Sequence, residues 1–133
     1  MDARKFLPIA ERYRRSSDEA ERRTSAGRSY YALFNVILAA LSEKGVNFGG
    51  TGQDHQQLIA YMKNARSKAA ASIADALKAL RQERNDADYR LNFAFNESRS
   101  RYAYLKAIDA LSQFDAIPAA EMASIVRIIQ ALP

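Results

Sequence analysis

The sequence predicts an all-α protein, an up-and-down helical bundle of about five to six helices that forms a single domain over residues 1–133. Three observations predict this class. Apolar residues recur at helical spacing along most of the chain, only five Gly and three Pro interrupt it, and no stretch alternates in the manner of a strand. A chain of this length can also bury a core without disulfides, and it contains no Cys.

The first predicted helix covers roughly residues 2–15. Pro8 is compatible with it only in the opening turns, where a backbone N–H is not needed. A long second helix is predicted to follow Ser17, a typical N-terminal capping residue, with Asp18 and Glu19 as acidic residues of its first turn, and to end at Gly45, the residue type that most often closes a helix.

The segment GVNFGGTGQ, residues 45–53, holds four of the five Gly residues and predicts a flexible connector. It follows no strand and does not match a P-loop, so a phosphate-binding loop is not favoured. A short third helix, capped by Asp54, comes next. The fourth begins near Ser67 or Ala69 and continues through Asp88, with Leu91 as its furthest end.

A fifth helix is predicted to start at Asn96 or Ser98, and a sixth follows Pro118 and ends at Leu132. The core face of the fifth helix is predicted from its large apolar residues at three-residue spacing, which are Tyr102, Leu105, Ile108 and Leu111.

The chain is basic, with a formal net charge of +5, and 14 of its 20 basic residues are Arg. Guanidinium groups match phosphate geometry, although a codon bias toward Arg would give the same composition. The longest apolar run, residues 30–41, has 12 residues and is too short for the roughly 20 of a membrane helix. We therefore expect no membrane partner, and the lack of Cys suits a cytoplasmic protein.

Arg84 breaks the apolar pattern of the fourth helix. It lies on the stripe that otherwise carries Ile73, Leu77, Leu80, Ala87 and Leu91. An unpaired buried charge is costly, so the guanidinium must meet Asp88 one turn on, backbone carbonyls or a phosphate from outside. A polar stripe runs beside it, made of Lys78, Arg81, Asn85, Tyr89 and Asn92.

The second helix has the same organisation. Its core stripe consists of Gly27, Tyr30, Phe34, Ile37 and Leu41, and its more polar neighbour of Arg28, Tyr31, Asn35 and Leu38. If the two helices pack antiparallel, the polar stripes converge on one basic cleft. The alternative is that the aromatic residues are core residues whose hydroxyls are satisfied.

Two motifs carry a family resemblance. The segments GRSYYALFN (residues 27–35) and LRQERNDADY (residues 80–89), separated by the Gly-rich connector and DHQQLIAYM, resemble the HEPN superfamily, in particular the branch with R-x-Y-Y-A-x-F-H and R-N-x-A-D-Y. The resemblance implies a helical bundle that forms a homodimer, with the motif helices meeting across the twofold axis.

The resemblance also implies a site. Many members are metal-independent ribonucleases, often toxins paired with a nucleotidyltransferase-like antitoxin, with an R-N-x-x-x-H pattern. Arg84 matches the motif Arg and would hold the scissile phosphate, Asn85 would orient it, and Tyr89 stands in the place of the catalytic His. Asn35 likewise replaces a His. A phenol with a pKa of about 10 is a poor base at pH 7, by roughly 4 kcal/mol, so Tyr89 is expected to donate a proton or stack on a base.

The function predicted first is that of an RNA-directed toxin-antitoxin or defence component that binds RNA or cleaves it weakly without metal. The RNA-binding cleft would be lined by Arg28, Tyr31, Asn35, Lys78, Arg81 and Asp88. Two alternatives stay open: a non-catalytic interaction subunit that dimerises and docks a nucleotidyltransferase-type partner, and a nucleotide-binding module.

His55 is the only His of the chain and lies outside both motifs, at the start of the third helix. A capping or surface role is expected unless the fold brings it to the site. With one His and no Cys, neither a transition-metal site nor a cofactor is expected.

Overall fold

The computed structural model describes residues 1–50 and 52–133, and Thr51, within the predicted flexible connector, lies outside the described residues. The described chain is entirely helical, without strands, which confirms the all-α prediction. Its elements are a short 3-10 helix, η1 (Ala3–Phe6), followed by α1 (Leu7–Tyr13), α2 (Glu19–Glu43), α3 (Asp54–Lys63), α4 (Lys68–Tyr89), α5 (Glu97–Asp115) and α6 (Ala119–Ala131).

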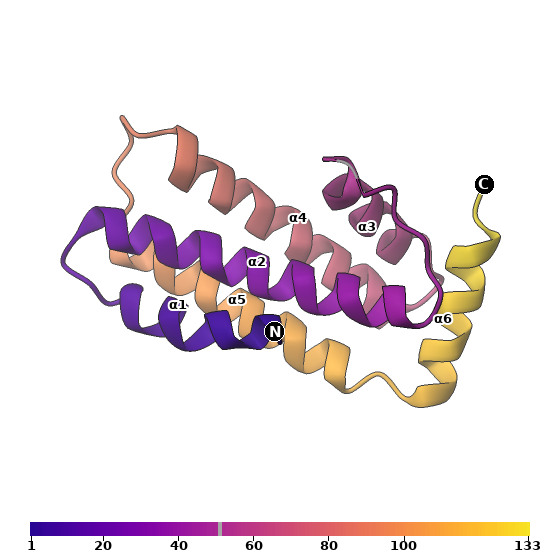
Figure 1. Cartoon of the computed structure of the whole chain (residues 1–133). Coiled ribbons are helices and arrows are strands. Elements are labelled where there is room, and N and C mark those ends of the chain that lie inside the picture. Colours follow the sequence, from indigo (N-terminus) through magenta and orange to yellow (C-terminus); the bar gives the residue numbers. More distant parts are fainter. Residues whose placement is uncertain (51) are drawn as a thin grey trace.

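Four of these helices form the body of the bundle. Helices α1, α2, α4 and α5 lie side by side with alternating chain direction, so α2 and α4 run antiparallel (Figure 1). The short helix α3 packs on α4, and α6 crosses the end of the bundle at which α2 finishes (Figure 1). One cluster of buried apolar residues links α2 to α6.

Side-chain caps set the starts of three helices. The carboxylate of Asp18 accepts the Ala20 N–H, and the Ser67 hydroxyl and the Asn96 side chain accept N–H groups in α4 and α5. Pro8 lies in the first turn of α1, as its missing N–H requires. The predicted caps of α2 and α3 were each wrong by one residue. Asp18 rather than Ser17 caps α2, and in α3 Gln53 holds the capping position while Asp54 already belongs to the helix.

The end of α2 follows from Gly45. Its φ of +94° is a conformation that L side chains rarely adopt, and it turns the chain so that the Val46 N–H donates to the Leu41 carbonyl at 3.0 Å. Val46 is thereby buried beside the last turn of α2. The predicted C-terminal cap is confirmed.

The predicted core stripes of α2 and α4 are buried as expected, apart from Leu91. Gly27, Tyr30, Phe34, Ile37 and Leu41 all face the interior, as do Ile73, Leu77, Leu80 and Ala87. Leu91 is exposed because α4 ends at Tyr89 and the chain turns away before the stripe returns to the core.

The predicted core face of α5 was wrong. Tyr102, Leu105 and Ile108 are exposed, and only Leu111 is buried. The buried face of α5 consists instead mostly of small residues, with two large apolar residues near its end; its members are Ser100, Ala103, Ala107, Ala110, Leu111 and Phe114. Small side chains let helix backbones approach closely, so the first part of this face is buried against the neighbouring helices without large apolar groups.

The most buried guanidinium is that of Arg23 on α2. It donates from Nη1 to the Ala87 carbonyl at 2.8 Å and from Nη2 to the Phe93 carbonyl, and its guanidinium carbon lies 5.4 Å from the centre of the Phe95 ring. Further contacts reach the carbonyls of Asp86 and Arg90. Arg23 therefore gives a hydrogen-bond donor to Ala87 in the last turn of α4, where the helix supplies none, and to Phe93 in the segment that follows α4.

Candidate functional site

Arg84 lies on the face of α4 that meets α2, and 22% of its side chain is exposed. Its Nη2 donates to the Tyr31 hydroxyl oxygen at 2.7 Å, and its Nη1 to the Asn85 side-chain oxygen at 3.4 Å. Its Nε lies 3.0 Å from Asp88 Oδ2, but is not aligned to donate a hydrogen bond, so this contact is an ion pair only. The guanidinium is thus partly buried and held, as the apolar stripe predicted.

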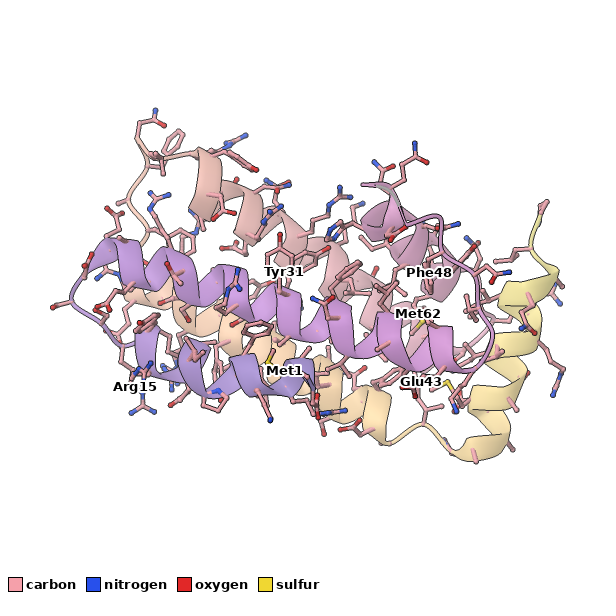
Figure 2. The ribbon with its side chains drawn as sticks, viewed as in Figure 1. Met1, Arg15, Tyr31, Glu43, Phe48 and Met62 are labelled. Atoms are coloured by element: carbon pink, nitrogen blue, oxygen red, sulfur yellow. The ribbon has the colours of Figure 1, made fainter. Side chains whose placement is uncertain are left out.

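Tyr31 links the two motif helices. Its ring centre lies 5.2 Å from the guanidinium carbon of Arg84 and 5.1 Å from that of Arg28, so two cations flank one aromatic ring. Figure 2 shows Tyr31 at the edge of α2 that faces α4. Arg28 also lies over Phe6 of η1 and makes no hydrogen bond or ion pair within the described chain. Tyr31, from the polar stripe of α2, therefore meets Arg84, which interrupts the apolar stripe of α4.

The fold brings His55 to the same place. Its ring stacks on Phe34 with 4.1 Å between the ring centres, and its Nδ1 lies 2.6 Å from the Tyr30 hydroxyl. Tyr31 packs against the edge of the imidazole. The ring is half-buried, while Nε2 has no hydrogen-bond partner among residues 1–50 and 52–133 and is not one of the buried unpaired atoms there. His55 is the functional candidate that sequence reasoning placed outside the site.

The electrostatics of this site favour a neutral imidazole. Burial lowers the pKa of His55 below its usual 6.5, and the nearby charges of Arg81 and Arg84 lower it further. Burial also raises the pKa of the Tyr30 hydroxyl to about 12, which the same two guanidinium groups only partly oppose. At neutral pH the pair is therefore an uncharged imidazole hydrogen-bonded to a protonated phenol.

A basic groove lies between α3 and α4. It has a volume of about 330 Å³ and is lined by groups that include Lys63, Lys78 and Arg81, with Asp75 as its carboxylate. Arg81 makes no hydrogen bond or ion pair with any described residue, so all its guanidinium donors are free. His55 does not line the groove, but the charge of Arg81 acts on its imidazole. The groove can accept an anion.

Two predicted site residues, Tyr89 and Asn35, do not contact Arg84 or His55. Tyr89, at the last position of α4, is 72% exposed and has no hydrogen bond or ring contact with the described chain. Asn35 donates to the Tyr31 carbonyl on its own helix at 2.8 Å and lines a different hollow, between η1 and α2.

Other kinds of site are not found in residues 1–50 and 52–133. No group of three or more His, Cys, Asp or Glu residues is placed to hold a metal ion there. Within the same ranges, no helix combines the length and apolar character needed to cross a membrane.

Comparison with known proteins gives no match to a family model, to a curated protein or to a solved structure. The function is therefore inferred from the geometry of the site.

Proposed function

We propose that this chain is an HEPN-like, RNA-directed protein that cleaves RNA, or binds it without cleavage, in the cleft formed by α2, α3 and α4. The observation that carries the proposal is the position of His55, the only histidine, whose pKa is lowered by burial and by Arg81 and Arg84 beside it. In the motif pattern the catalytic His position is occupied by Tyr89. His55, on α3, would provide the missing imidazole.

The chemistry follows from these groups. In metal-independent cleavage the 2′-hydroxyl loses its proton to a base, its oxygen bonds to phosphorus, and the 5′-oxygen leaves and takes up a proton. His55 is suited to be the base, because its lowered pKa keeps the ring unprotonated at pH 7. For Nε2 to accept the proton, the ring hydrogen must lie on Nδ1 and be donated to the Tyr30 oxygen, across the observed contact of 2.6 Å.

The arginines near the site are assigned two different roles toward the RNA phosphates. Arg84 has donors already engaged by Tyr31 and Asn85, so it is a fixed positive charge for the phosphate. Arg81 and Arg28 have no hydrogen-bond partners in the described chain and can contact neighbouring phosphates. Tyr89, exposed and without a partner, is assigned to stacking on an RNA base.

The test is cleavage of single-stranded RNA by purified protein in EDTA. We expect His55→Gln to reduce the rate by about 100-fold or more, and Arg84→Gln to abolish measurable cleavage. Arg127→Gln removes one charge from an exposed position on α6 and should leave the rate unchanged. Equal cleavage by all four proteins would indicate a contaminating nuclease and contradict a catalytic site here.

RNA binding is measured separately by fluorescence anisotropy over a salt series. If Arg81 contacts a phosphate, Arg81→Gln should reduce the slope of log Kd against log salt by about 0.7. Binding without cleavage would support the RNA-binding form of the proposal. A chain that neither binds nor cleaves RNA would exclude both forms.

One observation favours the second candidate, a non-catalytic subunit that docks a nucleotidyltransferase-type partner. Three residues close together in the sequence are exposed: Tyr89, the last residue of α4, and Leu91 and Phe93 in the segment that follows the helix. Such clustering is typical of protein-binding surfaces. The test is coexpression with a nucleotidyltransferase, where one is encoded beside this chain. Wild type is compared with the double variant Leu91→Ser with Phe93→Ser. Only a docking subunit should form a complex with the nucleotidyltransferase that the double variant loses.

A further inference from the structure

Helix α5 carries an apolar stripe that faces away from the core. Tyr102 and Leu105 are each 45% exposed and Ile108 is 36% exposed, and they follow one another at three-residue spacing on one side of the helix. The opposite side of α5 is already buried through its alanines. Large apolar side chains in a row on a folded surface are typical of a contact with another protein.

Two exposed charges flank this stripe at equal distances from Leu105. Arg101 lies four residues before it and Asp109 four residues after it, and both are exposed. Arg101 has no hydrogen bond or ion pair within the described chain, and Asp109 accepts only the Gln113 side-chain N–H at 2.9 Å. Tyr102 and Ile108 stand three residues before and after Leu105. Reversing the direction of the helix therefore keeps the apolar pattern and exchanges Arg101 with Asp109. Lys106, whose Nζ lies 5.6 Å from the centre of the Tyr102 ring, is a further charge beside this stripe, and the exchange does not match it with an acid.

We propose that α5 binds α5 of a second copy of this chain, antiparallel, about a twofold axis at Leu105. In a twofold interface residue i meets residue j and j meets i, so each Arg101 faces an Asp109 and each Tyr102 packs on an Ile108. Parallel pairing in register would instead bring Arg101 onto Arg101 and Asp109 onto Asp109. The charge pattern therefore selects both the partner and the direction.

This interface is independent of the proposed RNA site, because α5 carries none of its residues. It also differs from the pairing of motif helices that the family resemblance implies. One helix face lies at the small end of specific interfaces, so we expect a dimer that dissociates on dilution.

The test uses two opposite charge changes, Arg101→Glu and Asp109→Lys, with the molar mass in solution measured by sedimentation equilibrium. Each variant alone places like charges opposite each other at both ends of the interface. We expect each to raise the dimer dissociation constant at least about tenfold. Circular dichroism confirms that both fold, and Arg127→Glu on α6 is the control for a change of charge elsewhere.

The decisive measurement is an equimolar mixture of the two variants. In the mixed dimer both charge pairs are again opposite in sign, so dimerisation should return although neither variant dimerises alone. The double variant Arg101→Glu with Asp109→Lys should dimerise as well. A wild type that stays monomeric at about 500 µM, or a mixture that stays monomeric while the wild type dimerises, would overturn the proposal.

Discussion

The Tyr30 hydroxyl and Nδ1 of His55 lie 2.6 Å apart, and they join the middle of α2 to the first turn of α3. Tyr30 is fully buried, and stacking on Phe34 holds the other side of the imidazole in place. The ring therefore has one nitrogen fixed by the protein and one nitrogen left for a ligand. Such an arrangement is what a positioned acid or base requires.

The pKa of His55 can be measured directly, because a chain with a single His gives a single imidazole titration by proton NMR. We expect the pKa to be below 6.5, and Arg81→Gln to raise it, because one of the positive charges that oppose protonation is removed. Arg127→Gln should not change it. A wild-type pKa at or above 6.5 would contradict the burial and charge environment described for the ring.

The same shift predicts how stability depends on pH. The folded-state pKa of His55 is lower than its unfolded value, so between the two values only the unfolded chain binds the proton. The free energy of unfolding should therefore decrease as pH falls from about 7 toward 5, and be insensitive to this group above that range. Urea unfolding of wild type and His55→Gln measures the effect. The variant should show the smaller decrease; equal decreases would assign the dependence to carboxylates.

Arg23→Met should destabilise the fold strongly. The substitution keeps much of the buried volume but leaves the carbonyls of Ala87 and Phe93 without their donor. We expect a loss of about 3 kcal/mol in the free energy of unfolding, measured in urea. The exposed Arg15, which pairs only with Glu11, is the matched control, and Arg15→Met should cost about 0.5 kcal/mol. Similar losses for the two variants would contradict a capping role for Arg23.

Ala107→Leu tests the close packing of α5. Ala107 is fully buried where α5 meets its neighbours, so the larger side chain must push helices apart. We expect a loss of about 2 kcal/mol in the free energy of unfolding. Ala20→Leu, at an exposed position of α2, should change it by less than about 0.5 kcal/mol. A neutral Ala107→Leu would show that α5 does not pack closely through its small residues.

Local signals in the sequence predicted the helices well, because caps act within a few residues of the groups they satisfy. Ser67 and Asn96 cap helices as predicted, Gly45 ends one, and the cap of α2 is Asp18, one residue after the predicted Ser17. The partial burial of Arg84 was also predictable, since this residue interrupts a continuous apolar stripe on a long helix, but its hydrogen bond with Tyr31 was not among the contacts expected for it.

What the sequence did not reveal depends on packing between helices. His55 reaches the site only because α3 folds back on α4 after a connector whose path no periodicity determines. Helix α5 has two faces with apolar residues, one made mainly of alanines and one of larger side chains. Periodicity alone does not decide which of the two faces is buried. The capping role of Arg23 depends on carbonyls more than 60 residues further along the chain.

The hydrogen bonds from Arg23 to these distant carbonyls have a consequence for local motion. The segment between α4 and α5 has the composition and exposure of a loop that frays, yet its carbonyls at Arg90 and Phe93 are held by a side chain from α2. Opening this segment requires withdrawing Arg23 from the interior. Local opening of this segment should therefore be coupled to opening of the first turns of α2. The segment between α4 and α5 and the start of α2 should unfold as one cooperative unit.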